Sequence, residues 1–192
     1  MSEFLKFLTD YKDSLPIIGV IVGGAFALSR WIVDQRWRRV QYAYELVSKF
    51  FAKENTKKAL TMLDAETKIE LFPNESTLEA RQFFVSDALI IEALRTDMKT
   101  GFDRSAFAVR LIFDEFFTDL SMFQHHIDAR LIKLADVQPY LGYWIDSING
   151  HGLVFEQVHT VALATRINEF LRAFGYKAIL RLSKSMGISL RK

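Results

Sequence analysis

The stretch that decides the fold is residues 14–29, SLPIIGVIVGGAFALS, sixteen residues without a single charged side chain. A basic cluster begins directly after it, at Arg30. A bilayer core of about 30 Å needs about twenty helical residues. Tyr11 and Trp31 stand twenty positions apart, and aromatic rings of this kind prefer the two headgroup layers. The sequence therefore predicts a transmembrane helix over residues 14–33.

The lysines and arginines on the two sides of this segment predict its orientation. Residues 1–13 carry Lys6 and Lys12, whereas residues 30–39 carry four arginines. The positive-inside rule then makes residues 1–13 a short extracytoplasmic N-terminus and residues 34–192 a cytoplasmic domain, so the expected location is the inner membrane. Basic side chains beside the anchor are expected to meet anionic lipid headgroups, at about 1 kcal/mol each. They are Arg30, Arg36, Arg38 and Arg39, with Lys184, Arg191 and Lys192 of the basic C-terminal tail.

Two other interpretations of the apolar stretch are weaker. Ala25-Phe26-Ala27 resembles a signal-peptide cleavage site, but Asp10 and Asp13 precede the stretch and arginines follow it, which opposes export. A buried core helix of a soluble protein would tolerate Pro16 and three glycines poorly. A membrane anchor fits the flanking residues better than either.

Small residues recur at every fourth position of the stretch, at Gly19, Gly23 and Ala27. Such a ridge lets two membrane helices approach closely. The sequence therefore predicts a homo-oligomer formed through the anchor. Nucleic acid is not an expected partner, because no segment combines a broad basic face with stacking aromatics.

The rest of the chain has a helical period, which predicts an all-α fold: the anchor helix continuing to about residue 54, then a bundle of about five further helices. The stripe Val33, Trp37, Val40, Tyr44, Val47 and Phe51 is expected to pack on the domain. Residues 64–72 leave two options open, a short edge strand or an extended connector. The further helices are expected at 55–63, 76–97, 103–133, 136–148 and 153–174, and a basic segment follows to residue 192.

Few residues of the chain are arranged as a catalytic or metal site would require. The chain has no cysteine, which excludes thiol catalysis and thiolate zinc sites. His125 and His126 are adjacent and point about 100° apart on a helix, so they would rarely bind one ion together. The carboxylates Asp114, Glu115, Asp119 and Asp128 fit a solvated helix face. The sequence predicts no enzyme, metal or cofactor, although an unrecognised site near His125, His126 and Asp128 stays an alternative.

Two segments carry a resemblance: WIVDQRWRRVQYAYELVSKFF at 31–51, and FDEFFTDLSMFQHHIDARLIKLADVQPYLGYWIDSI at 113–148. In this layout the chain resembles a bacterial family of small single-pass, membrane-anchored, all-helical proteins of unknown function. The resemblance implies an anchor and a helical domain, and it carries over no active-site residue. The expected function is a membrane-anchored interaction or scaffold protein that acts through a partner protein, in signalling or phage defence. The alternative to this is a pore-forming effector that oligomerises through its anchor.

Overall fold

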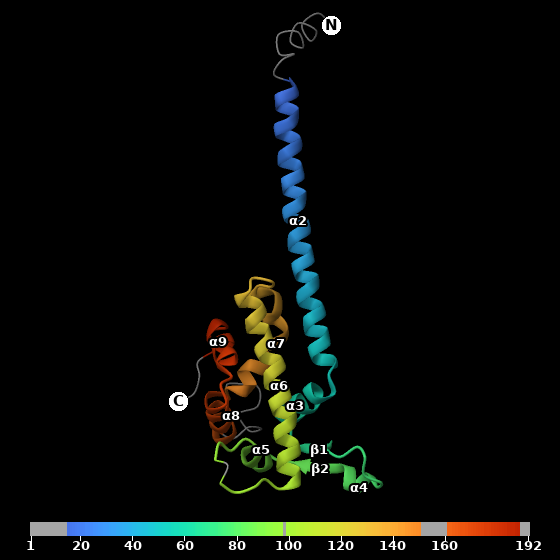
Figure 1. Ribbon diagram of the computed structural model, residues 1–192, viewed down its shortest axis with the longest axis vertical. Helices are drawn as coiled ribbons and strands as arrows, with labels where there is room; N and C mark the ends of the chain where they lie inside the picture. The colour runs from blue at the N-terminus through green and yellow to red at the C-terminus, as the bar shows by residue number, and fades with distance from the viewer. Residues whose placement is uncertain (1–14, 98, 151–160, 189–192) are drawn as a thin grey trace, which may run out of the picture. The chain divides into compact units, whose positions relative to one another are not determined.

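The computed structural model describes residues 15–97, 99–150 and 161–188, and the side chains of its first helix from residue 19 onward. These residues form eight helices and one two-stranded sheet (Figure 1). The fold is thus mostly helical, as predicted. The elements are α2 Leu15–Ala52, α3 Glu54–Asp64, β1 Thr67–Glu70, α4 Leu78–Arg81, β2 Gln82–Val85, α5 Asp87–Ala93, α6 Arg104–Asp128, α7 Leu134–Ile148, α8 Val161–Ala173 and α9 Lys177–Ser185.

The apolar stretch and the residues after it form one continuous helix, α2, of 38 residues. This confirms the prediction that the first helix runs on to about residue 54. The chain divides into two compact units after Tyr42, at 1–42 and 43–192. Over the part of the chain that the structure describes, no helix combines the length and the apolarity that a membrane span requires.

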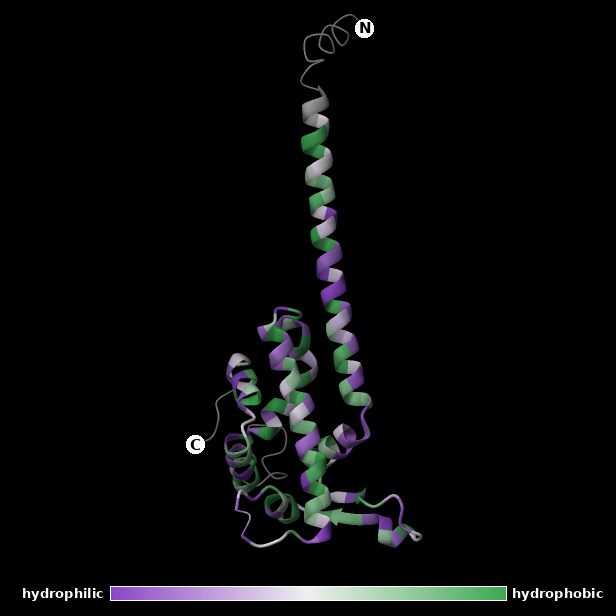
Figure 2. Cartoon of the chain, in the orientation of Figure 1, coloured by the Kyte–Doolittle hydropathy of each residue, from purple (hydrophilic) through white to green (hydrophobic). Residues whose placement is uncertain are grey.

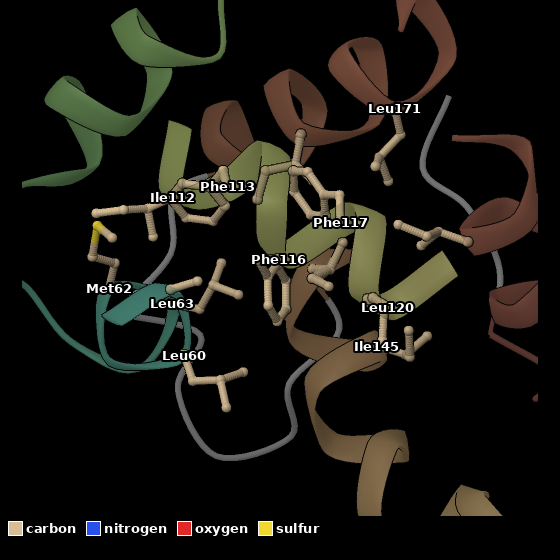
Figure 3. Packing of buried hydrophobic residues seen from close by; sticks show 14 of the residues in the cluster. Leu60, Met62, Leu63, Ile112, Phe113, Phe116, Phe117, Leu120, Ile145 and Leu171 are labelled. Carbon is tan, nitrogen blue, oxygen red and sulfur yellow. The ribbon is translucent and has the colours of Figure 1, made fainter. Parts of the chain in front are cut away.

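Helix α6 provides the centre of the core in residues 43–192. Phe113, Phe116, Phe117, Leu120 and Phe123 are almost fully buried along it. Leu60, Met62 and Leu63 of α3 pack beside it, together with Ile145 of α7 and Leu171 of α8 (Figure 3). The helix that was expected over residues 103–133 ends earlier, at Asp128. Arg130 takes a positive φ of 59° just after it, and Leu131 is exposed.

A hairpin interrupts the helix that was expected over residues 76–97. A helix does begin near Ser76, capped by the Thr77 hydroxyl, which accepts from the Ala80 N–H at 3.2 Å, but that helix ends at Arg81. Residues Gln82–Val85 instead form β2, which pairs antiparallel with β1. Aromatic and β-branched residues favour a strand, and the Phe83 ring lies 5.3 Å from that of Phe72. The same pairing resolves 64–72 in favour of a strand.

The C-terminal helices begin and end close to the expected places. Helix α7 starts two residues before Asp136, because the Asp136 carboxylate accepts from the Lys133 N–H at 2.8 Å inside the first turn. Gly150 and Gly175 follow α7 and α8 with positive φ values of 72° and 82°, a conformation that ends helices. Of the helix expected at 153–174, residues 153–160 lie outside the described residues. The basic segment expected after it contains a further helix, α9, so the described helices exceed the predicted number.

Candidate functional site

The apolar segment of α2 presents hydrophobic side chains around the whole helix. Every residue from 19 to 38 is exposed, including the large apolar side chains of Val20, Ile21, Val22, Phe26 and Leu28. Figure 2 shows hydrophobic residues along the first described turns and hydrophilic residues further along the helix. A helix that is apolar on all sides is normally buried in a protein or in a bilayer. Residues 1–14 of the predicted topology lie outside the described residues.

The arginines after this segment form a belt around α2. Arg30, Arg36 and Arg38 are exposed, and Arg39 is half-buried. Because successive residues turn by about 100°, Arg36, Arg38 and Arg39 point to different sides of the helix. Such a belt can meet headgroups in any rotational setting of the helix.

The predicted small-residue ridge lies on accessible helix surface. A Cβ added at Gly19 or Gly23 would meet no atom within 4 Å, and Ala27 is exposed. Gly19, Gly23 and Ala27 follow one another by one turn and so lie on neighbouring parts of one side. The ridge is therefore open to a second helix.

The stripe that was expected to pack on the domain does so only at its end. Val33, Trp37, Val40 and Tyr44 are exposed, whereas Val47 is buried and Phe51 half-buried. The core-facing residues of α2 are Ala43, Val47 and Phe50. At 100° per residue these point about a quarter turn away from the exposed stripe. The prediction treated two separate apolar faces of α2 as one.

The basic C-terminal residues are only partly within the described chain. Helix α9 buries Ile179 and Leu182 and exposes Lys184. Arg181 on the same helix pairs with Asp128, with Nη2 and Oδ2 2.9 Å apart. Arg191 and Lys192 lie outside the described residues.

The residues of the alternative enzyme site make ordinary helix contacts. His126 Nδ1 lies 2.6 Å from the Met122 carbonyl oxygen one turn earlier, and His125 is exposed. Asp128 accepts from the Gln124 amide at 2.6 Å, in addition to its ion pair with Arg181. Within the described ranges, no three histidine or carboxylate side chains are placed to hold a metal ion.

Two of the carboxylates on α6 fasten α3 and the residue before it. The Lys53 ammonium donates to Asp119 at 2.7 Å, and the Asn55 amide donates to Glu115 at 2.6 Å. Asp114 is half-buried on the same helix: burial raises its pKa, and the nearby Arg110 guanidinium opposes that rise. Tyr176 donates to the Asp114 carboxylate at 3.3 Å. These contacts explain the acidic face of α6 by packing between elements.

Sequence reasoning missed Arg110, a charged residue buried in the core. Its guanidinium donates to the carbonyls of Ala93 and Arg95 at 3.0 and 3.1 Å, where α5 ends. Phenylalanine rings surround it, with centroids 4.7–5.0 Å away: Phe102, Phe170 and Phe174. The signal was its place beside Val109 and one turn before Asp114, where an arginine can bury its stem and keep a partner.

Comparisons with known proteins identify no relative: protein-family models, curated proteins and solved structures all give no match to this chain.

Proposed function

We propose that this chain is a single-pass, membrane-anchored helical protein of the inner membrane, whose domain lies in the cytoplasm and acts through a partner protein in signalling or defence. The observation that carries the proposal is the exposed apolar surface of α2. From residue 19 to Val33, its side chains are exposed on every side, and charge enters only at Arg30. Water would hydrate such a surface at a cost of about 25 cal/mol per Å², which lipid removes.

The arginine belt supports the same proposal. Arg30 lies at the edge of the apolar segment, where its stem can reach the headgroups, and Trp31 and Trp37 suit the interface. Arg36, Arg38 and Arg39 follow within three turns. Anionic lipid would attract each of them by about 1 kcal/mol, and the bias toward this side keeps residues 43–192 in the cytoplasm.

A pair of side chains on the domain supports action through a protein partner. Phe107 and Leu111 stand one turn apart on α6, and each exposes about half of its surface. Exposed apolar side chains mark contact sites where they join into a contiguous patch, and these two are neighbours on the helix surface. A photo-crosslinking residue at 107 is expected to give a heteromeric adduct in cells, while the same residue at exposed Glu79 is expected to give none. Equal labelling from both positions would count against this contact.

The anchor is tested by alkaline carbonate extraction of membranes from expressing cells. The unaltered chain is expected in the pellet. The double variant Ile21→Lys/Val22→Lys is expected in the supernatant, because each lysine at the centre of a span costs about 2.5–3.5 kcal/mol. The matched control is Leu78→Lys, on an exposed leucine of α4, which is expected to stay in the pellet. Extraction of the unaltered chain would overturn the proposal.

A further inference from the structure

We propose that α2 pairs in parallel with α2 of another copy along one continuous seam, formed by Gly23, Phe26, Arg30, Val33, Trp37 and Val40. This deepens the proposed function, since it names the partner of the anchor helix and extends the contact beyond the apolar segment. The pairing itself does not require a membrane, so the two ideas can fail separately.

The spacing of these positions is regular. They follow one another by three, four, three, four and three residues, the alternation that marks a repeat of about 3.5 residues. Helices with this repeat stay in contact by winding around each other in a left-handed supercoil. Gly19 precedes Gly23 by four and so extends the same repeat.

All six positions are exposed in the described chain. The exposed fractions of the large apolar members run from 38% for Val40 to 68% for Phe26 and Trp37. The repeat would continue through Tyr44 to Val47, but Val47 is 4% exposed and belongs to the core of residues 43–192. The seam therefore ends where α2 enters that core.

Lipid does not account for the part of the seam that follows Val33. Beyond Val33 the helix reads DQRWRRVQ, so Trp37 and Val40 are the apolar residues of residues 34–41. Val40 lies ten residues past Arg30, about 15 Å along the helix. A headgroup layer is only about 5–8 Å thick. An upright helix would thus leave Val40 in water unless another protein surface covers it.

Another copy of this chain fits the seam by its own pattern. The partner must be a helix that is apolar along one part and amphipathic along the next, with the same repeat and the same boundary. A second α2 meets each condition in register. Arg30 is the polar member, and one polar residue in such a seam fixes register at some cost in stability. Asp34, one turn further on, offsets part of the repulsion between two arginines.

The absence of cysteine makes this pairing directly testable, because each single-cysteine variant has one thiol. In a parallel, in-register pair every residue on the seam meets its own copy. In isolated membranes under mild oxidation, Val33→Cys and Val40→Cys are expected to give several-fold more disulfide dimer than Gln35→Cys and Arg38→Cys. The two controls are also exposed on α2 but point away from the seam.

Other outcomes would overturn the seam. Equal crosslinking at all four positions would indicate random collision. Crosslinking of Gly23→Cys without Val40→Cys would indicate helices that cross at the glycines and then diverge. Carbonate extraction of the same variants separates this result from the anchor: extracted protein that still crosslinks at Val33 and Val40 would retain the seam and contradict the anchor.

Discussion

The ring of Phe50 lies edge-on to the ring of Phe123, with the two centroids 5.3 Å apart. Phe50 belongs to the last turn of α2 and Phe123 to α6, and the Phe116 ring lies 5.8 Å from Phe50 as well. The C-terminal end of α2 is thereby part of the domain core. The helix that carries the exposed apolar segment ends among buried phenylalanines.

Truncation of Phe50 is expected to destabilise the domain strongly. Phe50→Ala removes a buried ring together with its contacts to the rings of Phe116 and Phe123, and such changes cost about 3–5 kcal/mol. Phe51→Ala is the matched control, because Phe51 is only half-buried and should cost clearly less. Urea unfolding of the full chain, followed by circular dichroism, measures both. Equal losses would show that Phe50 is not the residue that ties α2 to the core.

Loss of Arg110 is expected to leave two carbonyls and Asp114 without their cation. Hydrogen bonds from charged groups contribute about 1.5–3 kcal/mol each, so Arg110→Ala should lower the free energy of unfolding by about 2–4 kcal/mol. Arg110→Lys keeps the charge and should lose less. Arg104→Ala is the exposed control: it removes a pair with Glu75 and a contact with the Phe72 ring, and should cost less than about 1 kcal/mol. A loss for Arg110→Ala no larger than that of Arg104→Ala would contradict this role.

Asp114 should make stability depend on pH. Burial raises its pKa above the ordinary 3.8, against the opposing charge of Arg110. The folded state therefore holds the proton more tightly than the unfolded state does, and this contribution is lost as pH rises through the raised pKa. Asp114→Asn removes the titration and is expected to be at least as stable as the unaltered chain at pH 7. As pH falls to 3.8, the free energy of unfolding of the unaltered chain should rise relative to that of Asp114→Asn.

Asp103 should make stability depend on pH in the opposite direction to Asp114. The backbone N–H of Ala106 donates to its carboxylate at 2.7 Å and lowers its pKa. Its contribution to stability is present above pH 3.8 and is lost as pH falls through the lowered pKa. Asp103→Asn keeps the helix cap and should remove only this acid-side loss. If both variants shifted the pH dependence of stability in the same direction, the direction of the pKa shift given for at least one of the two carboxylates would be wrong.

Local signals in the sequence predicted much of this fold. Asp103 and Thr77 cap helices, and Gly150 and Gly175 end them, because these effects depend on a few neighbouring residues. The strand Gln82–Val85 was missed because its stability comes from pairing with Thr67–Glu70, a partner distant in sequence. The exposed stripe on α2 was assigned to the core because spacing alone cannot tell which of two apolar faces the domain covers. Arg110 was missed since its partners, the carbonyls ending α5 and the rings of Phe170 and Phe174, meet only in the folded chain.

Spin labels on single cysteines in liposomes test most directly whether the apolar segment of α2 lies in lipid. Val22 and Leu78 are matched sites, with exposed fractions of 63% and 65%. We predict that a label at Val22 collides readily with oxygen and is shielded from a water-soluble nickel complex, while a label at Leu78 shows the reverse. Equal access of the nickel complex to both labels would contradict a location of this segment in lipid.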